Sequence, residues 1–132
     1  MIIGIGSDIV SVKRIVELDK KYPKKFLERI FTPFEIDCSK DKINKYNYFA
    51  KRFAAKEAFS KAIGLGIGRG FNFNDIEVFN DDLGKPFLRI LNSKKPLFNE
   101  KKINLELDEI NIHLSLSDDS DFAHAFVVIE KK

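Results

Sequence analysis

The sequence predicts an α+β fold in which an N-terminal strand and helices are followed by an antiparallel sheet. Up to Ile63 the apolar residues recur mainly at helical spacing, and beyond Gly70 they recur at every second position, the period of a strand. Helices that precede antiparallel strands are typical of this class. Because 132 residues are enough for one core, we expect a single domain over residues 1–132.

The first half of the chain is expected to be mainly helical. MIIGIG is a short β-rich run that ends in glycines, and a helical pattern follows it as far as Pro23. A pair of short helices is expected to break at Thr32-Pro33, where Thr can cap a helix and Pro can occupy its first turn. A longer helix is expected from about Asn47 to Ile63, ended by the glycines at 64, 66, 68 and 70.

The second half is expected to form antiparallel strands. FNDIEVF, residues 73–79, alternates as a strand, NDDLGK makes a turn, and PFLRIL returns as its partner. INIHLSLS, residues 110–117, is the clearest strand, with its isoleucines and leucines on one face, and FAHAFVVIE forms the last one. Residues 92–109 fit a short helix or a loop equally well.

Composition indicates an ordinary globular protein, with 44% hydrophobic and 33% charged residues. The single cysteine, Cys38, excludes a disulfide framework and a multi-cysteine metal site, and it fits a reducing cytoplasm. We see no signal peptide and no apolar run near the roughly 20 residues of a membrane span. A soluble cytoplasmic protein without membrane contact is therefore expected.

Charge is divided unevenly along the chain. Residues 1–70 carry 15 basic and eight acidic side chains, whereas residues 71–132 carry eight and twelve. This polarity favours an anionic ligand or an acidic protein partner over a neutral substrate. It also permits a non-catalytic module that binds a nucleotide or RNA, but no recognition helix, RNP-like aromatic strand or GXXG clamp is evident.

The stretch RFAAKEAFSKAIGLGIGRG, residues 52–70, places one Glu and one Lys on a helix face of small residues. Glu57 and Lys61 fall along a stripe formed by Ala50, Ala54 and Ala58, whereas Lys51, Arg52 and Lys56 are open charges elsewhere around the helix. The plain interpretation is an ion pair one turn apart, worth about 0.3–0.5 kcal/mol. Alternatively, Glu57 holds a metal, since an unpaired buried carboxylate is costly, and the alanines let a ligand or a neighbouring chain come close.

Asp8 is the second carboxylate of interest. It follows a strand and a glycine turn and precedes a helix, so it is either a plain helix N-cap or an oxygen ligand for a divalent cation. Asp8 and Glu57 together would suit Mg²⁺, which accepts one or two carboxylates, waters and substrate phosphates. Lys61 could then neutralise phosphate charge, and the glycines of 64–70 could bring backbone N–H groups to a phosphate chain. The glycines form no P-loop, because the G-K-[ST] ending is missing.

Four stretches occur in an order and spacing that resemble a known family: GIGSDIVSVKRI at 4–15, RFAAKEAFSKAIGLGIGRG at 52–70, DLGKPFL at 82–88 and IHLSLSDDSDFAHAFVVIE at 112–130. From residue 2 to residue 130 the sequence resembles the bacterial holo-[acyl-carrier-protein] synthases, the short class of 4′-phosphopantetheinyl transferases. The resemblance is weakest across 92–109. The pair of G-x-D and K-E-A-x-x-K at this separation is its most specific feature.

The resemblance implies a set of site residues. It implies that Asp8 and Glu57 bind Mg²⁺ and that Lys61 contacts a coenzyme A phosphate. It also implies a coenzyme A cleft lined by Gly64, Gly66, Gly84, Lys85, Pro86 and the strand end at Ser117. The family usually has His directly after S-L-S, near the nucleotide 3′-phosphate, where this chain has Asp118. Because an acid there would repel phosphate, Arg52, Ser117 and nearby lysines are expected to compensate, or the coenzyme lies differently.

The implied reaction is Mg²⁺-dependent transfer of phosphopantetheine from coenzyme A to a serine of apo acyl carrier protein, for fatty acid biosynthesis. It releases adenosine 3′,5′-bisphosphate. Such phosphoryl transfer depends on positioning and charge neutralisation. The serine proton goes either to Glu57 or to a metal-bound water, and the sequence leaves both open.

The resemblance also implies partners. Family members form trimers with the cleft between subunits, and the stripe Ala50, Ala54, Ala58 would serve such packing unless it lies in the core. On the first helix, Arg14 and Lys21 share a face with Leu18 between them. A cationic stripe around an exposed aliphatic residue suits an acidic carrier protein, and Arg14 is the residue expected to contribute most.

Overall fold

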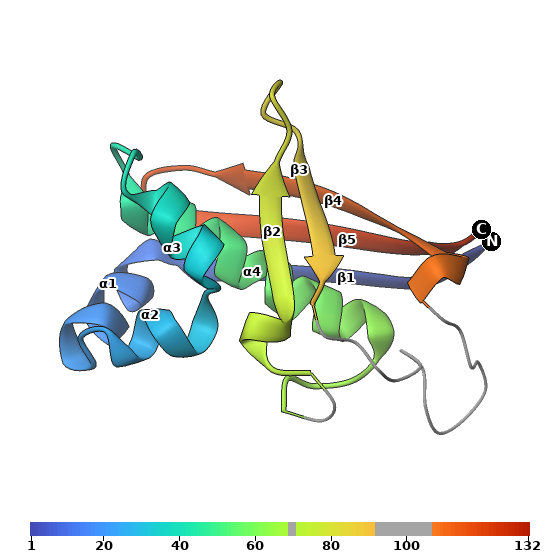
Figure 1. Cartoon of the computed structure of the whole chain (residues 1–132), viewed down its shortest axis with the longest axis horizontal. Coiled ribbons are helices and arrows are strands. Elements are labelled where there is room, and N and C mark those ends of the chain that lie inside the picture. Colours follow the sequence, from blue (N-terminus) through green and yellow to red (C-terminus); the bar gives the residue numbers. More distant parts are fainter. Residues whose placement is uncertain (69–70, 92–106) are drawn as a thin grey trace.

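The structure, a computed structural model, describes residues 1–68, 71–91 and 107–132 (Figure 1). In chain order its elements are β1 (Ile2–Ser11), α1 (Val12–Lys21), α2 (Lys25–Ile30), α3 (Pro33–Ser39), α4 (Lys45–Ile63), the 3₁₀ turn η1 (Phe73–Asp75), β2 (Ile76–Asn80), β3 (Pro86–Ile90), the 3₁₀ turn η2 (Leu107–Glu109), β4 (Ile110–Asp118) and β5 (Phe122–Lys131). This order confirms the predicted α+β class.

The strands form two antiparallel sheets. β5 lies between β1 and β4 in a three-stranded sheet, and β2 and β3 form a separate hairpin. The helix α4 packs along one face of the three-stranded sheet, mainly against β1 and β5, and the hairpin lies on the other side of that helix (Figure 1). The helix is therefore the centre of the molecule.

Strand β1 is longer than the sequence predicts. Gly4 and Gly6 do not form a turn, because β1 continues through Asp8 to Ser11, the residue before α1. A Cβ atom on Gly4 would lie 2.1 Å from the carbonyl oxygen of Ala62, and one on Gly6 would lie 1.9 Å from that of Ala58. The glycines are thus the contact surface on which α4 packs against the strand, a tertiary feature that local sequence pattern does not reveal.

The alanine stripe of α4 is the matching half of this contact. Ala50, Ala54 and Ala58 are each 0% exposed inside a single chain, so they belong to the core. The expectation that they admit a ligand or a neighbouring chain is therefore wrong. At its end, α4 terminates in the predicted way, because Gly64 adopts a left-handed conformation with φ of 75°.

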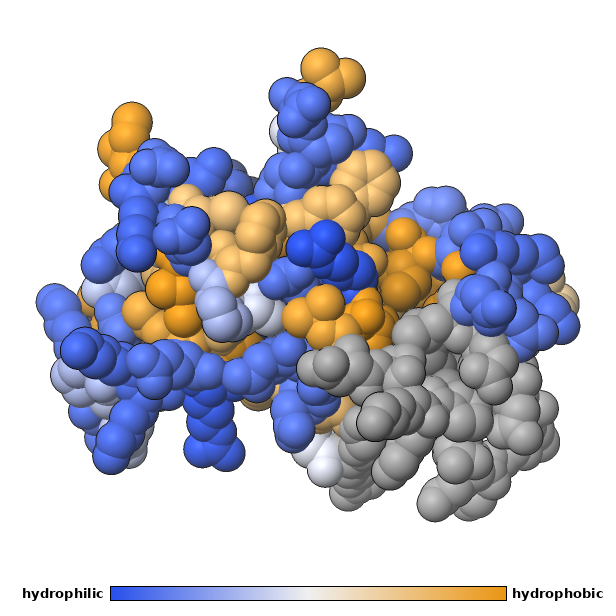
Figure 2. Space-filling model, viewed as in Figure 1, coloured by the Kyte–Doolittle hydropathy of each residue, from blue (hydrophilic) through white to orange (hydrophobic). Residues whose placement is uncertain are grey.

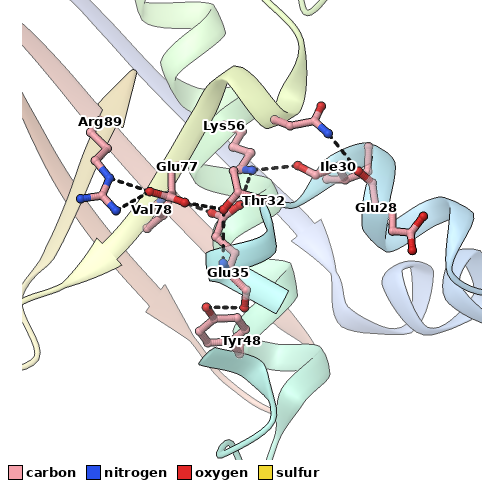
Figure 3. Close-up of polar contacts among 10 residues, drawn as sticks. Glu28, Ile30, Thr32, Glu35, Tyr48, Lys56, Glu77, Val78 and Arg89 are labelled. Atoms are coloured by element: carbon pink, nitrogen blue, oxygen red, sulfur yellow. Dashed lines mark hydrogen bonds and ion pairs between the residues drawn. The ribbon is translucent and has the colours of Figure 1, made fainter. Parts of the chain in front are cut away.

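Two charges expected to be open are buried, and one of them organises a polar network (Figure 3). Lys56 is 0% exposed, and its ammonium lies 2.6 Å from Oε1 of Glu35 and 2.8 Å from the carbonyl oxygen of Ile30. Glu35 also completes a capping box with Thr32, which caps α3 before Pro33 as predicted. The network ties α4 to α2 and α3.

The same network reaches the hairpin. The other oxygen of Glu35, Oε2, accepts a hydrogen bond of 2.9 Å from the backbone N–H of Val78. Thr32 donates to Glu77 at 2.6 Å, and Glu77 accepts from Nε of Arg89 at 2.6 Å (Figure 3). Buried charges need such partners to be tolerated, so this contact fixes β2 and β3 at one place beside α4.

The predicted strand pair at 73–79 and 86–91 is confirmed with shifted bounds. Residues Phe73–Asp75 form η1, so β2 begins at Ile76, and β3 ends at Ile90. The strand predicted at 110–117 is β4, and its Ile and Leu side chains alternate with exposed polar ones. Of the ambiguous segment 92–109, the described part is η2, and residues 92–106 lie outside the described residues.

The sheet face turned away from α4 is apolar and open. Gly4, Gly6, Asp8 and Val10 point toward α4, so the alternate residues of β1 point away from it. Ile5 and Ile9 on this outer face are 61% and 65% exposed, and Phe126 of β5 is 41% exposed. No helix in the described part of the chain is long and apolar enough to cross a membrane.

Candidate active site

Asp8 owes its position to the alternation of β1. It follows Gly6 by two residues and therefore lies on the strand face that α4 covers, opposite Ala125 of β5. Its side chain is 16% exposed. The expectation of a helix N-cap is wrong, because the N-cap of α1 is Ser11.

Lys61 of α4 binds to β1 rather than to its neighbour on the helix. Its ammonium lies 3.1 Å from Oδ1 of Asp8 and 2.9 Å from the carbonyl oxygen of Ser7. The predicted helix-edge ion pair with Glu57 is thus replaced by a contact between two elements. The Lys61 side chain remains 55% exposed, so its ammonium is accessible to an anion from solvent.

Glu57 lies half-buried beside this pair. Burial raises the pKa of the Glu57 carboxyl, the negative charge of Asp8 raises it further, and the positive charges of Lys61 and Arg14 partly oppose the rise. Four charged groups from β1, α1 and α4 therefore act on one another at this point. The sequence prediction that Asp8, Glu57 and Lys61 belong together agrees with this geometry.

A cleft of about 570 Å³ opens beside Glu57. Its lining residues come from α2, the end of α4, the glycine segment and η1: Arg29, Glu57, Ser60, Gly66, Ile67, Gly68, Asn72, Phe73 and Asn74. Asn74 fastens η1 to α2 by donating 2.9 Å to the carbonyl oxygen of Glu28. The sequence prediction did not place Arg29 or the two asparagines at the site. Asn74 was interpreted as part of a strand over residues 73–79, whereas the N-x-x-D capping pattern of Asn72 and Asp75 was the available signal.

The glycine segment leaves α4 beside this cleft. After the left-handed Gly64, Gly68 is also in the left-handed region with φ of 93°, and its N–H donates 2.7 Å to the carbonyl oxygen of Phe71. No atom lies within 4 Å of a Cβ placed on Gly64 or Gly66. The backbone there is open to an approaching ligand, whereas Arg69 and Gly70 lie outside the described residues.

The remaining predicted coenzyme contacts lie apart from this group. Ser117 is opposite His124, which is opposite Ile9, so Ser117 belongs to the outer sheet face and not to the face that carries Asp8. Gly84, Lys85 and Pro86 form the turn and the first residue of β3 at the tip of the hairpin. The predicted site residues thus lie in three parts of one chain: around Asp8, on the outer sheet face and at the tip of the hairpin.

Arg52 is not an open cation. It is 4% exposed, its guanidinium carbon lies 3.7 Å from the centroid of the Tyr48 ring, and it donates a hydrogen bond to Oδ1 of Asn80. In this position it cannot compensate for Asp118 by touching a phosphate. Asp118 instead has partners in α4, Lys51 at 3.4 Å and Asn47 at 3.1 Å, so its negative charge is partly neutralised.

The donor set near Asp8 fits a hard divalent cation that keeps most of its waters. Burial raises the pKa of the Glu57 carboxyl, and the negative charge of Asp8 raises it further, so the two carboxylates lie close enough to interact. Among the described residues no group of three or more His, Cys, Asp or Glu side chains gathers, so a fully protein-ligated cage is not formed there. Mg²⁺ is usually bound through one or two carboxylates with water and phosphate completing its shell.

Comparisons with known proteins show which family this chain is similar to. Residues 4–127 match the model of a family described as the 4′-phosphopantetheinyl transferase superfamily. The holo-[acyl-carrier-protein] synthase of Wolbachia pipientis subsp. Culex pipiens (strain wPip) is 48% identical over an alignment of 136 positions, which covers 98% of each chain.

Two solved structures are similar over their whole length. The holo-[acyl-carrier-protein] synthase of Neisseria meningitidis is 45% identical with a TM-score of 0.83, covering 99% of this chain and 100% of that one. The Bacillus anthracis synthase in complex with coenzyme A (3′,5′-ADP) is 42% identical with a TM-score of 0.80, covering 100% of this chain and 99% of that one.

Proposed function

This chain belongs to the 4′-phosphopantetheinyl transferase superfamily, and from that premise we propose that it is a holo-[acyl-carrier-protein] synthase. It transfers the 4′-phosphopantetheine group of coenzyme A to a serine of apo acyl carrier protein and releases adenosine 3′,5′-bisphosphate. The observation that carries the proposal is the meeting of Asp8, Glu57 and Lys61 beside an open cleft. The proposed place in metabolism is fatty acid biosynthesis in the cytoplasm.

Asp8 and Glu57 are the residues that would hold Mg²⁺. When bound there, the ion would supply positive charge that offsets the negative charge of a pyrophosphate. Lys61 has an accessible ammonium and binds phosphate beside the two carboxylates. The serine hydroxyl also needs a proton acceptor, and the Glu57 carboxylate, which lines the cleft, is proposed for that role.

The remaining coenzyme contacts are proposed to come from a second chain. Gly64 and Gly66 offer open backbone near Glu57, whereas Gly84, Lys85, Pro86 and Ser117 lie in other parts of the same chain. A cleft between subunits would bring residues from these separate parts together. We therefore propose a homotrimer with coenzyme A bound between protomers.

The outer sheet face supports this assembly. Ile5, Ile9 and Phe126 form an exposed apolar surface of the kind that marks protein–protein contacts. Replacing Phe126 by Asp should give monomers in sedimentation velocity, whereas Ile43→Asp, at a fully exposed position, should not. A wild-type protein that sediments as a monomer and still turns over would refute the trimer.

Acyl carrier protein is proposed to dock on α1. Arg14 is exposed and close enough to Glu57 to lower its pKa, so an acidic helix bound there would deliver its serine to the carboxylates. Leu18 is half-buried against the core, so it offers less surface than the sequence predicts, and Lys21 is exposed at the end of α1. Arg14→Glu should weaken carrier binding strongly and leave coenzyme A affinity nearly unchanged.

One experiment tests the function. The protein is incubated with coenzyme A, Mg²⁺ and apo carrier protein, and the carrier is then weighed by mass spectrometry. Wild type should add one phosphopantetheine, and Asp8→Ala or Glu57→Ala should add none while remaining folded. A variant that transfers at a near-normal rate would overturn the metal assignment. A non-catalytic nucleotide or RNA binder would show no mass increase, and its affinity would follow salt concentration.

A further inference from the structure

The tip of the β2–β3 hairpin stands away from the rest of the molecule (Figure 1). Hydrophilic residues surround an apolar end (Figure 2), where Leu83 is 95% exposed. Core packing therefore cannot hold the tip in place, and its shape depends on hydrogen bonds. The tip matters because it carries Gly84, Lys85 and Pro86.

The turn itself is organised by Asp81. Its Oδ1 accepts from the backbone N–H of Leu83 at 2.9 Å and from that of Lys85 at 2.8 Å. Gly84, with φ of 88°, donates 3.0 Å to the carbonyl oxygen of Asp81. These bonds define the turn internally, but they do not connect it to the body of the protein.

Besides the paired strands below it, the tip has a side-chain link to α4, which runs through the amide of Asn80. Its Oδ1 accepts from the guanidinium of Arg52, and its Nδ2 donates 2.9 Å to the carbonyl oxygen of Gly84. The orientation of the amide follows from chemistry, since a guanidinium has only donors and a carbonyl only accepts. The position needs a side chain that accepts one hydrogen bond and donates another. Alanine has no polar side-chain atom and could make neither bond.

Arg52 is a firm anchor for this amide. It is almost completely buried on α4, and it lies against the Tyr48 ring. Its Nε has no hydrogen-bond partner within the described ranges, so Asn80 is an important partner of the guanidinium. The positive charge also polarises the amide and thereby strengthens its bond to Gly84.

We propose that Asn80 is a positioning residue for coenzyme A. Its amide joins the buried guanidinium of Arg52 to the turn at Gly84–Pro86 and so holds that turn in place. The inference rests on the proposed function, in which this turn contacts coenzyme A. With its oxygen bonded to Asn80, the Gly84 carbonyl is kept from facing a phosphate-bearing ligand, while Lys85 remains exposed. Arg52 then acts on the coenzyme through Asn80 and not by contact.

The test measures coenzyme A binding by calorimetry and transfer kinetics for wild type, Asn80→Ala, Arg52→Met, the double variant and Asp82→Ala. Asn80 is exposed at the end of β2, so its loss should leave the fold intact. Asn80→Ala should raise both Kd and KM for coenzyme A by about three- to tenfold, the range of a hydrogen bond. The kcat at saturating coenzyme A and the KM for carrier protein should stay within about twofold, because no group that reacts has changed.

The double variant separates a relay from a direct contact. Arg52→Met should impair coenzyme A binding, and adding it to Asn80→Ala should cause no further loss, since one chain of bonds is broken in both cases. Asp82→Ala, on the same turn but outside the relay, should resemble wild type. Arg52→Lys, which keeps a donor, should lie between wild type and Arg52→Met.

Three results would overturn the inference. Unchanged coenzyme A affinity in Asn80→Ala would remove the relay, and multiplicative losses in the double variant would show that Arg52 contacts the coenzyme directly. An equal loss of kcat and of carrier affinity in Asn80→Ala would indicate general damage instead of positioning. If wild type itself neither binds coenzyme A nor transfers, the proposed function fails, and this is seen before any variant is compared.

Discussion

Replacing Gly6 by alanine should force β1 away from α4. The new Cβ would lie 1.9 Å from the carbonyl oxygen and 2.9 Å from the carbonyl carbon of Ala58, and 2.8 Å from the backbone nitrogen of Ala62. Overpacking costs about 1–3 kcal/mol when side chains can yield. Here the obstacle is the backbone of α4, which cannot yield as a side chain can. The cost should therefore be at or above the upper end of that range, a fall of about 3 kcal/mol or more in the free energy of unfolding. For a chain of this size that corresponds to a melting temperature lower by about 10 °C.

Urea unfolding followed by circular dichroism measures this cost, and Gly66→Ala is the matched control. A Cβ on Gly66 meets no atom within 4 Å, and its φ is not in the left-handed region, so that variant should change stability by less than about 0.5 kcal/mol. Gly6→Ala should also lose transferase activity, because Asp8 lies on the same strand face two residues later. A Gly6→Ala protein within about 1 kcal/mol of wild type would refute the packing argument.

Three further predictions concern charged groups. Folding raises the pKa of the Glu57 carboxyl, so this group stabilises the folded protein below the pKa of the unfolded chain, and that stabilisation is lost as the pH rises through the folded pKa. In thermal melts without metal, Glu57→Gln should therefore be more stable than wild type at pH 7 by a few tenths of a kcal/mol, after solvent screening. Near pH 4 the two proteins should be equally stable. Lys61→Met removes the ammonium that lies beside Asp8, so a metal ion would no longer compete with that positive charge. Mn²⁺ binding, measured by electron paramagnetic resonance without coenzyme A, should become about two- to fivefold tighter. Weaker binding would contradict this. Lys56→Met leaves a buried carboxylate without its cation and should lower the free energy of unfolding in urea by about 3–5 kcal/mol. Lys51→Met, at a pair whose side chains are 29% and 30% exposed, should lower it by less than about 1 kcal/mol.

Features determined by neighbouring residues were predictable from the sequence. The cap at Thr32, the proline after it and the stop at Gly64 depend on side chains within a few positions, and all three are confirmed. The same holds for the alternation of β4. In these cases the chemistry that forms the element and the pattern that predicts it are the same.

Features that depend on distant residues were not predictable in this way. Gly4 and Gly6 look like a turn until α4 is placed against them, and Lys56 looks exposed until Glu35 is placed beside it. For the candidate site, the association of Asp8, Glu57 and Lys61 was inferred, but the choice of Asp8 as the partner of Lys61 depends on the approach of α4 to β1. The role of Asn80 required the hairpin and α4 to be seen together.

The pairing of β1 with β5 also has a consequence for the order of folding. Asp8 is opposite Ala125, and in the three-stranded sheet β1 has β5 as its neighbour, so during synthesis the strand that carries Asp8 must wait for residues made much later. Contacts between such distant positions slow folding, because a long loop has to close before they form. A ribosome-bound chain that ends before β5 would therefore hold α4 without a completed partner sheet. Arrest-peptide force measurements along the chain should show the main folding event only after residues 122–131 have left the exit tunnel.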